Sequence, residues 1–211
     1  NPQEARAHKA LAYIHLFFDW SWPEAIAAYN QAISHGYRAD NEFVSYYYIF
    51  IEKNYDLAIA VAQQTAAQDP LHVMSHWQLG LCYYFARRFE AALEAFDQCL
   101  TYEPDYSEAL RWKGLVLGYL ERFEEGLEYI DRALELTEGE GLALIDHITL
   151  HILRGDTKGI VEAIEAFSTS DPCDKAALFS LFNKPKRALS YLKKGLELNS
   201  MMLVTLKHYW L

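Results

Sequence analysis

The chain has 211 residues, 52% of them apolar, and a formal net charge of −10. So acidic a balance argues against direct nucleic-acid binding, which requires a basic stripe, and no apolar run reaches the roughly 18 residues that cross a bilayer. No Pro-, Gly- or Ser-rich linker divides the sequence, so the composition predicts one continuous domain, residues 1–211, with a long buried core.

Special residues recur along the chain with a period of 34. Pro70 and Pro104 are 34 residues apart, and Pro172 follows after 68. The same spacing relates Ala58, Ala92 and Gly126, the glycines Gly80 and Gly114, and the aromatic residues Tyr55, Phe89 and Phe123. A fixed period of this length is typical of a solenoid of stacked helical units.

The central unit shows what each period encodes. Residues 73–106 contain two apolar patterns of helical spacing, separated only by residues 86–88. So short a link predicts two antiparallel neighbouring helices. Gly80 and Ala92 let the two backbones approach closely, and Pro104 ends the unit because it lacks the N–H that would continue the helix.

In chain order, the pattern predicts regular units over about residues 6–38, 39–72, 73–106 and 107–140. The fifth unit, 141–174, is divergent because Ile148 and Ile160 occupy the close-packing positions, which should push its helices apart. The sixth, 175–200, is shortened, since Ala188 follows Ile160 after only 28 residues, and its first helix should span 175–182. Residues 201–211 should form a terminal helix.

The spacing Leu79-Gly80…Tyr83…Ala92…Phe96…Pro104 resembles the tetratricopeptide repeat, strongly from about residue 6 to 140. This resemblance implies an all-α, right-handed α-α superhelix of about six helical hairpins. It also implies a non-enzymatic scaffold that binds a protein or peptide. A narrower resemblance, carried by the opening FFDWSWPEAIAAYNQAI, is to the repeat portion of bacterial regulators, whose winged-helix, cyclase-type or kinase-type effector would lie outside this chain.

In the family resembled, the first helix of each repeat lines a concave groove that holds the ligand. The register then assigns nine residues of units 2–4 to partner binding: Phe43, Tyr47, Phe50, Trp77, Leu81, Tyr84, Arg111, Leu115 and Tyr119. Such an aromatic groove suits an apolar or amphipathic peptide. The alternative is that these rings only pack against one another.

Catalytic and metal-binding patterns are weak. No serine lies in a nucleophile turn, and no Gly-rich segment continues into a P-loop, so we expect neither an enzyme nor a cofactor. His147 and His151 have the spacing of two zinc ligands on one helix face, as do His72 and His76. Neither pair has a Glu in the H-E-x-x-H position or an obvious third ligand, so packed, hydrogen-bonded histidines are the favoured interpretation and no metal is expected.

Charge is unevenly distributed. Eight acids lie between Glu121 and Glu140, whereas residues 184–194 contain five cations. Both clusters are interpreted as solvated helix faces; the alternative is head-to-tail attraction between units 4 and 6 of different chains. The mostly apolar segment 201–211 offers a second route to self-association. Three cysteines, an odd number, suit reduced thiols in a cytoplasmic protein, with a periplasmic one as the alternative.

The function predicted from sequence is therefore an interaction scaffold or regulatory module with a concave aromatic groove. The alternative is a small-molecule-sensing domain of a bacterial transcriptional or signalling regulator, with an apolar ligand held between units 2 and 4. The partner, the pathway, the attached effector and the oligomeric state have no signature in the sequence.

Overall fold

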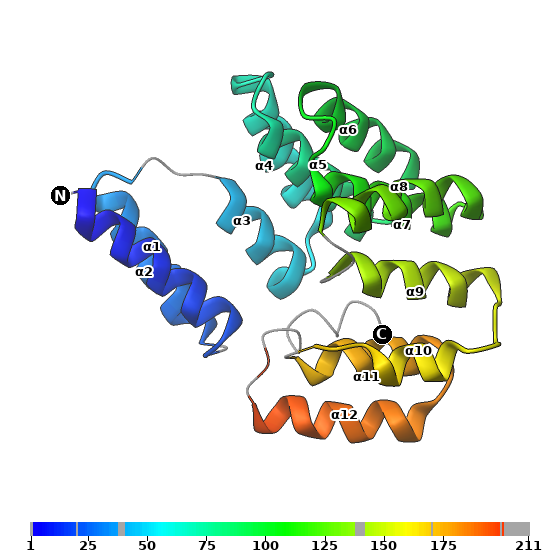
Figure 1. Cartoon of the computed structure of the whole chain (residues 1–211). Coiled ribbons are helices and arrows are strands. Elements are labelled where there is room, and N and C mark those ends of the chain that lie inside the picture. Colours follow the sequence, from blue (N-terminus) through cyan, green and yellow to red (C-terminus); the bar gives the residue numbers. More distant parts are fainter. Residues whose placement is uncertain are drawn as a thin grey trace.

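The computed structural model describes residues 2–19, 21–37, 41–137, 142–169, 171–198 and 200, and within these ranges every regular element is a helix. The helices form six consecutive pairs that follow a curved path (Figure 1). The pairs are α1 (Pro2–Phe17) with α2 (Trp22–Ser34); α3 (Asn41–Tyr47), continued by the π-helix η1 (Tyr48–Glu52), with α4 (Tyr55–Gln68); α5 (Val73–Phe85) with α6 (Phe89–Tyr102); α7 (Ser107–Tyr119) with α8 (Phe123–Leu136); α9 (Leu142–Arg154) with α10 (Ile160–Ala166); and α11 (Pro172–Leu181) with α12 (Pro185–Glu197). This is the solenoid that the 34-residue period predicts.

The turn inside each pair from the second to the sixth repeats the period in its backbone. One residue in a left-handed conformation lies five positions before the close-packing position, and these residues are Lys53, Arg87, Glu121, Gly155 and Asn183. In the third to sixth pairs the next N–H donates to a carbonyl five residues back, as from Arg88 to Tyr83 and from Arg122 to Leu117, both 2.9 Å. This pattern is the Schellman end of a helix, which reverses the chain and places the second helix beside the first.

The small residues act where the sequence predicts. A Cβ on Gly80 would lie 2.4 Å from the Phe96 ring, and one on Gly114 would lie 2.7 Å from the Gly126 carbonyl oxygen. Both distances are far below normal contact, so only glycine allows these paired helices to come so close.

The core is a row of clusters between neighbouring helices. One cluster joins α5, α6 and α7 around Trp77, Phe96 and Val116, and another joins α9–α12 around Ile148, Ile164 and Phe179. From the second pair to the sixth, each pair packs on the next, as α4 does on α5 and α8 on α9, which is typical of a solenoid.

The fifth and sixth units differ from the prediction in detail. α10 has only seven residues, and Ile148 and Ile160 are both buried in the cluster that α9 and α10 share with α11 and α12. α11 spans Pro172–Leu181 rather than 175–182. The reason is local: Asp171 accepts a hydrogen bond from the Cys173 N–H (2.8 Å), so Pro172 opens this helix instead of closing the unit before it. The predicted terminal helix, 201–211, lies outside the described residues.

Candidate partner-binding surface

The nine residues predicted to bind a partner lie on the first helices of units 2–4, as the register requires. They come from α3 and η1, from α5 and from α7. Seven of them are buried: Phe43, Phe50, Trp77, Leu81, Tyr84, Arg111 and Leu115. Only Tyr47 and Tyr119 are half-buried. Most of the set therefore packs inside the protein, and the two tyrosines have the most surface available to a partner.

Aromatic rings from three successive first helices form a continuous chain of contacts. The Phe50 and Phe85 ring centroids are 5.2 Å apart, and Phe85 contacts Tyr84 at the same distance. Tyr84 then meets Trp112 at 4.9 Å and Tyr119 at 5.9 Å. We call these five residues, Phe50, Tyr84, Phe85, Trp112 and Tyr119, the aromatic face. Phe43 lies apart from it, because its ring stacks on Tyr29 of α2 at 4.4 Å, in the cluster that α1, α2 and α3 share.

Phe85 and Trp112 were not among the predicted residues. Each directly follows a predicted position, Tyr84 and Arg111, and both are half-buried. The register identifies the side of a helix, but an aromatic side chain one position further on is long enough to reach the same surface. Both are aromatic residues directly after a predicted groove position, and this pattern in the sequence could have identified them.

A buried hydrogen-bond donor lies next to the aromatic face. Trp77, in α5, is only 9% exposed, and its indole N–H has no hydrogen-bond partner among the described residues. Its ring meets Tyr106 edge-on at 6.4 Å. Buried donors are nearly always satisfied, so an N–H without a partner beside this surface is unusual.

The one cation of the predicted groove is neutralised within the protein. Arg111 Nε lies 2.6 Å from Asp146 Oδ2 of α9, and its Nη1 donates to Glu108 Oε2 at 2.6 Å. Both Arg111 and Asp146 are almost fully buried, and the Nε and Oδ2 atoms meet as an ion pair without hydrogen-bond alignment. Burial raises the pKa of Asp146 to about 7, although Arg111 opposes the shift. No sequence pattern indicated this partner, because Asp146 lies 35 residues from Arg111.

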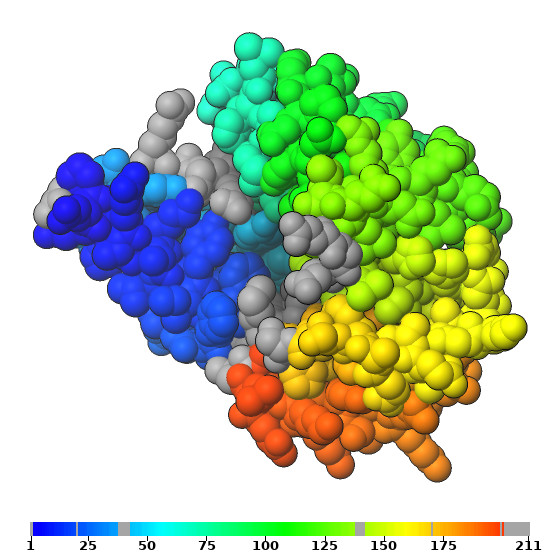
Figure 2. Space-filling view, viewed as in Figure 1, coloured from blue at the N-terminus to red at the C-terminus, as the bar shows by residue number. Residues whose placement is uncertain are grey.

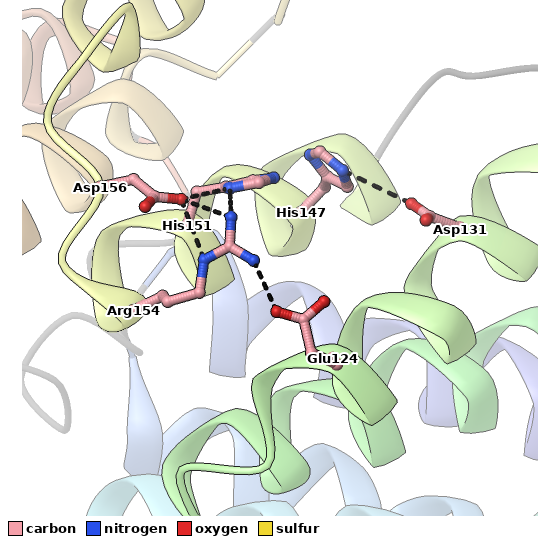
Figure 3. A network of polar contacts seen from close by, with 6 residues as sticks. All are labelled: Glu124, Asp131, His147, His151, Arg154 and Asp156. Atoms are coloured by element: carbon pink, nitrogen blue, oxygen red, sulfur yellow. Dashed lines mark hydrogen bonds and ion pairs between the residues drawn. The ribbon is translucent and has the colours of Figure 1, made fainter.

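The histidines that suggested a metal are paired with other groups (Figure 3). His147 Nε2 lies 3.4 Å from Asp131 Oδ1, and His151 Nδ1 lies 2.7 Å from Asp156 Oδ2. Arg154 bridges Asp156 and Glu124. The two imidazole centroids are 4.6 Å apart, and burial together with the nearby His151 lowers the pKa of His147.

The other histidine pair is also hydrogen-bonded. His72 meets the Ser75 hydroxyl and His76 the Pro70 carbonyl oxygen, at 2.8 and 2.7 Å. Over the part of the chain that the structure describes, no three His, Cys, Asp or Glu side chains gather to hold a metal. The same residues include no helix of the length and apolarity that would span a bilayer.

The cysteines and the acidic cluster agree with their simpler interpretations. Cys82, Cys99 and Cys173 are free and buried. The described acids between 121 and 137 lie at exposed positions, and three of them pair within the chain: Glu125 with Arg122 at 2.6 Å, Glu124 with Arg154 at 3.0 Å, and Asp131 with His147 at 3.4 Å. Attraction between chains through this cluster stays a prediction.

Comparisons with known proteins agree with this architecture. The family model for the tetratricopeptide repeat matches residues 53–98 and 83–141. Among solved structures, PilF of Pseudomonas aeruginosa superimposes with a TM-score of 0.62 at 16% identity, over 90% of this chain and 89% of that one. A tetratricopeptide repeat protein of Parabacteroides merdae gives 0.56 at 17% identity, over 98% and 86%. MamA gives 0.52 at 18% identity, over 76% and 95%. Comparison with curated proteins gave no significant match in sequence. At such identities the structural likeness shows the fold alone.

Proposed function

Because residues 53–141 are tetratricopeptide repeats within a longer solenoid of the same fold, we propose that this protein is a non-enzymatic interaction scaffold. Its partner is an apolar or amphipathic segment of another protein, and the binding surface is the aromatic face together with the half-buried Tyr47 of unit 2. Repeats of this kind act by presenting an extended surface assembled from successive helices.

The aromatic face is the observation that supports this proposal most directly. Its rings are held in place by one another across three successive units, so they lose little side-chain entropy when a ligand covers them. Tyr119 stacks on Phe89 at 5.3 Å, which leaves part of its ring accessible. Next to this surface, the unused Trp77 N–H fits a peptide carbonyl oxygen.

The test begins with peptides selected from a random display library against the full chain. Their affinities are then measured by isothermal titration calorimetry for the wild type and for Tyr47→Ala/Tyr119→Ala. We expect at least a tenfold loss in the double variant, as for removal of a binding hot spot. Tyr102→Ala removes a comparably exposed tyrosine from α6 and should leave the affinity unchanged.

A second variant addresses the buried donor. Trp77→Phe keeps an aromatic ring and removes the N–H, so it should weaken peptide binding several-fold without unfolding the protein. Selected peptides that bind the double tyrosine variant as tightly as the wild type would refute the assignment of this surface. A small molecule retained in native mass spectrometry, and displaced by none of the peptides, would favour the sensing function instead.

A further inference from the structure

Two successive seams, between α6 and α7 and between α8 and α9, share an arrangement of charge. At each, the acid lies on the second helix of one unit and the base on the first helix of the next. Asp97 of α6 binds Lys113 of α7, and Asp131 of α8 faces His147 of α9. At the equivalent place, Lys175 of α11 donates to the carbonyl oxygen of Glu165, immediately before the end of α10 (2.7 Å).

Apolar contacts flank the central charged pair at both of these seams, α6 with α7 and α8 with α9. In α6, Leu93 and Leu100 lie four residues before and three after Asp97, and both are half-buried, with Leu100 against the cluster that contains Leu110. In α8, Leu127 and Leu134 hold the same positions around Asp131 and pack against the clusters of Leu150 and Ala143. Two turns further along both helices, Glu124 of α8 binds Arg154 of α9 at 3.0 Å (Figure 3).

α12 repeats this pattern, but no following helix of the described residues packs on it. Counted from the small residue Ala188, as the others are from Ala92 and Gly126, the two leucine positions are Leu189 and Leu196. They are 55% and 59% exposed. α12 is the outermost helix at the lower edge of Figure 1, and its surface forms the lower edge of the space-filling view (Figure 2). Such exposure fits a docking surface, since the leucines at the same positions of α6 and α8 pack against the next helix.

The charges of this surface are reversed. Lys193 stands where the seams have Asp97 and Asp131, and Lys186 stands where α8 has Glu124. The neighbouring cations are used locally: Arg187 pairs with Glu165, and Lys194 lies over the Tyr191 ring. Lys186 and Lys193 are exposed and have no ion-pair partner in the described ranges. We call Lys186, Leu189, Lys193 and Leu196 the stacking face.

We propose that the stacking face binds an amphipathic helix of a partner protein, one that carries carboxylates where α9 carries His147 and Arg154. The bound helix extends the solenoid by one layer, with its apolar residues on Leu189 and Leu196 and its two acids, seven residues apart, on Lys193 and Lys186. Residues 201–211 contain neither Asp nor Glu, so they lack the carboxylates that this face requires. This site is separate from the aromatic face, and its test does not depend on the proposed function.

The probes are two synthetic peptides of residues 142–156, one with the natural sequence and one with His147→Glu and Arg154→Glu. Fluorescence anisotropy with the full chain measures both. The acidic peptide can form two partly exposed ion pairs, with Lys193 and Lys186, each contributing up to about 1 kcal/mol. It should therefore bind the wild type about tenfold more tightly than the natural peptide does. The difference should shrink as salt is raised from 50 to 500 mM.

Three variants make the test decisive. Lys186→Glu/Lys193→Glu should reverse the preference in favour of the natural peptide, whereas Lys53→Glu/Lys158→Glu, with the same change in net charge elsewhere, should preserve it. Leu189→Ala/Leu196→Ala should weaken both peptides. Equal binding of the two peptides, or a preference for the acidic one that survives Lys186→Glu/Lys193→Glu, would overturn the proposal. So would a dimer in sedimentation velocity that Leu189→Ala/Leu196→Ala abolishes, because the face would then belong to a second copy of the chain.

Discussion

Replacing Gly114 by alanine tests the close approach of paired helices on which the solenoid depends. The new Cβ would lie 2.5 Å from Ile130 Cγ1 and 2.7 Å from the Gly126 carbonyl oxygen. Ile130 can change rotamer, but the carbonyl belongs to the backbone of α8, so α7 and α8 must separate by about 1 Å. Overpacking of this kind costs about 1–3 kcal/mol, and the obstacle is backbone, so we expect about 3 kcal/mol. The better helix propensity of alanine returns about 1 kcal/mol. The net loss is therefore about 2 kcal/mol.

Gly118→Ala is the matched control on the same helix. There the new Cβ would meet only the Leu150 side chain, at 3.1 Å from Cδ1, which can shift. The gain in helix propensity should then leave this variant as stable as the wild type or slightly more so. Thermal and urea unfolding followed by circular dichroism at 222 nm should separate the two variants by about 4–8 °C in midpoint. If Gly114→Ala proves as stable as Gly118→Ala, the small residues do not set the helix spacing and the reasoning fails.

Three further predictions follow from the backbone and the buried ionisable groups. Glu121→Gly should raise the free energy of unfolding by about 0.5–1 kcal/mol, because residue 121 has φ 61°, which glycine adopts without strain. Urea unfolding measures this free energy, and a loss of stability in the variant would contradict the prediction. The pKa of Asp146 is raised to about 7, so its contribution to stability is complete below about pH 4 and is lost as the pH rises to about 7. The difference in unfolding free energy between wild type and Asp146→Asn should therefore fall with rising pH across this window, by at most about 1.4 kcal/mol per unit; a rising difference would refute the burial argument. Burial raises the pKa of Cys82 and Cys99 to about 12, so neither thiol should react with Ellman's reagent at pH 8 until urea unfolds the chain, and rapid labelling of either in the native protein would contradict this.

Much of the fold was predictable because the helices and turns of each unit depend on residues within that unit and the next one. A 34-residue period in the sequence shows these residues directly. Glycine at 80 and 114 marks where paired helices come close, and Pro70 and Pro104 mark the end of a unit. The start of α11 was mispredicted for a reason of the same local kind. A proline that closes a unit and one that opens a helix look alike until Asp171 is recognised as the N-cap in front of Pro172.

The candidate site was less predictable because register gives the side of a helix and not the depth of a side chain. The assignment placed Trp77, Tyr84 and Arg111 on the first helices of their units, where the structure also has them. It could not show that rings from adjacent units cover one another, or that Asp146 neutralises Arg111. Both depend on contacts between units, where side-chain length and rotamer decide burial.

The acids and bases of the seams are spaced regularly in the sequence, but only the contacts between successive units show that they pair. Asp97, Asp131 and Glu165 are spaced by 34 residues, and so are Lys113 and His147, yet a solvated helix face gives the same pattern. The structure shows that Asp97 faces Lys113 and Asp131 faces His147 between units, while Lys175 donates to the backbone carbonyl of Glu165. Lys193 then stands out, because a lysine in the place of an acid would repel a helix that carries a base at this position, as α7 and α9 do. Such a reversal selects between possible neighbours, since like charges at a packed seam are unfavourable whereas an acidic helix is favoured. The end of the described solenoid therefore differs in specificity from its interior, although its apolar contacts are the same.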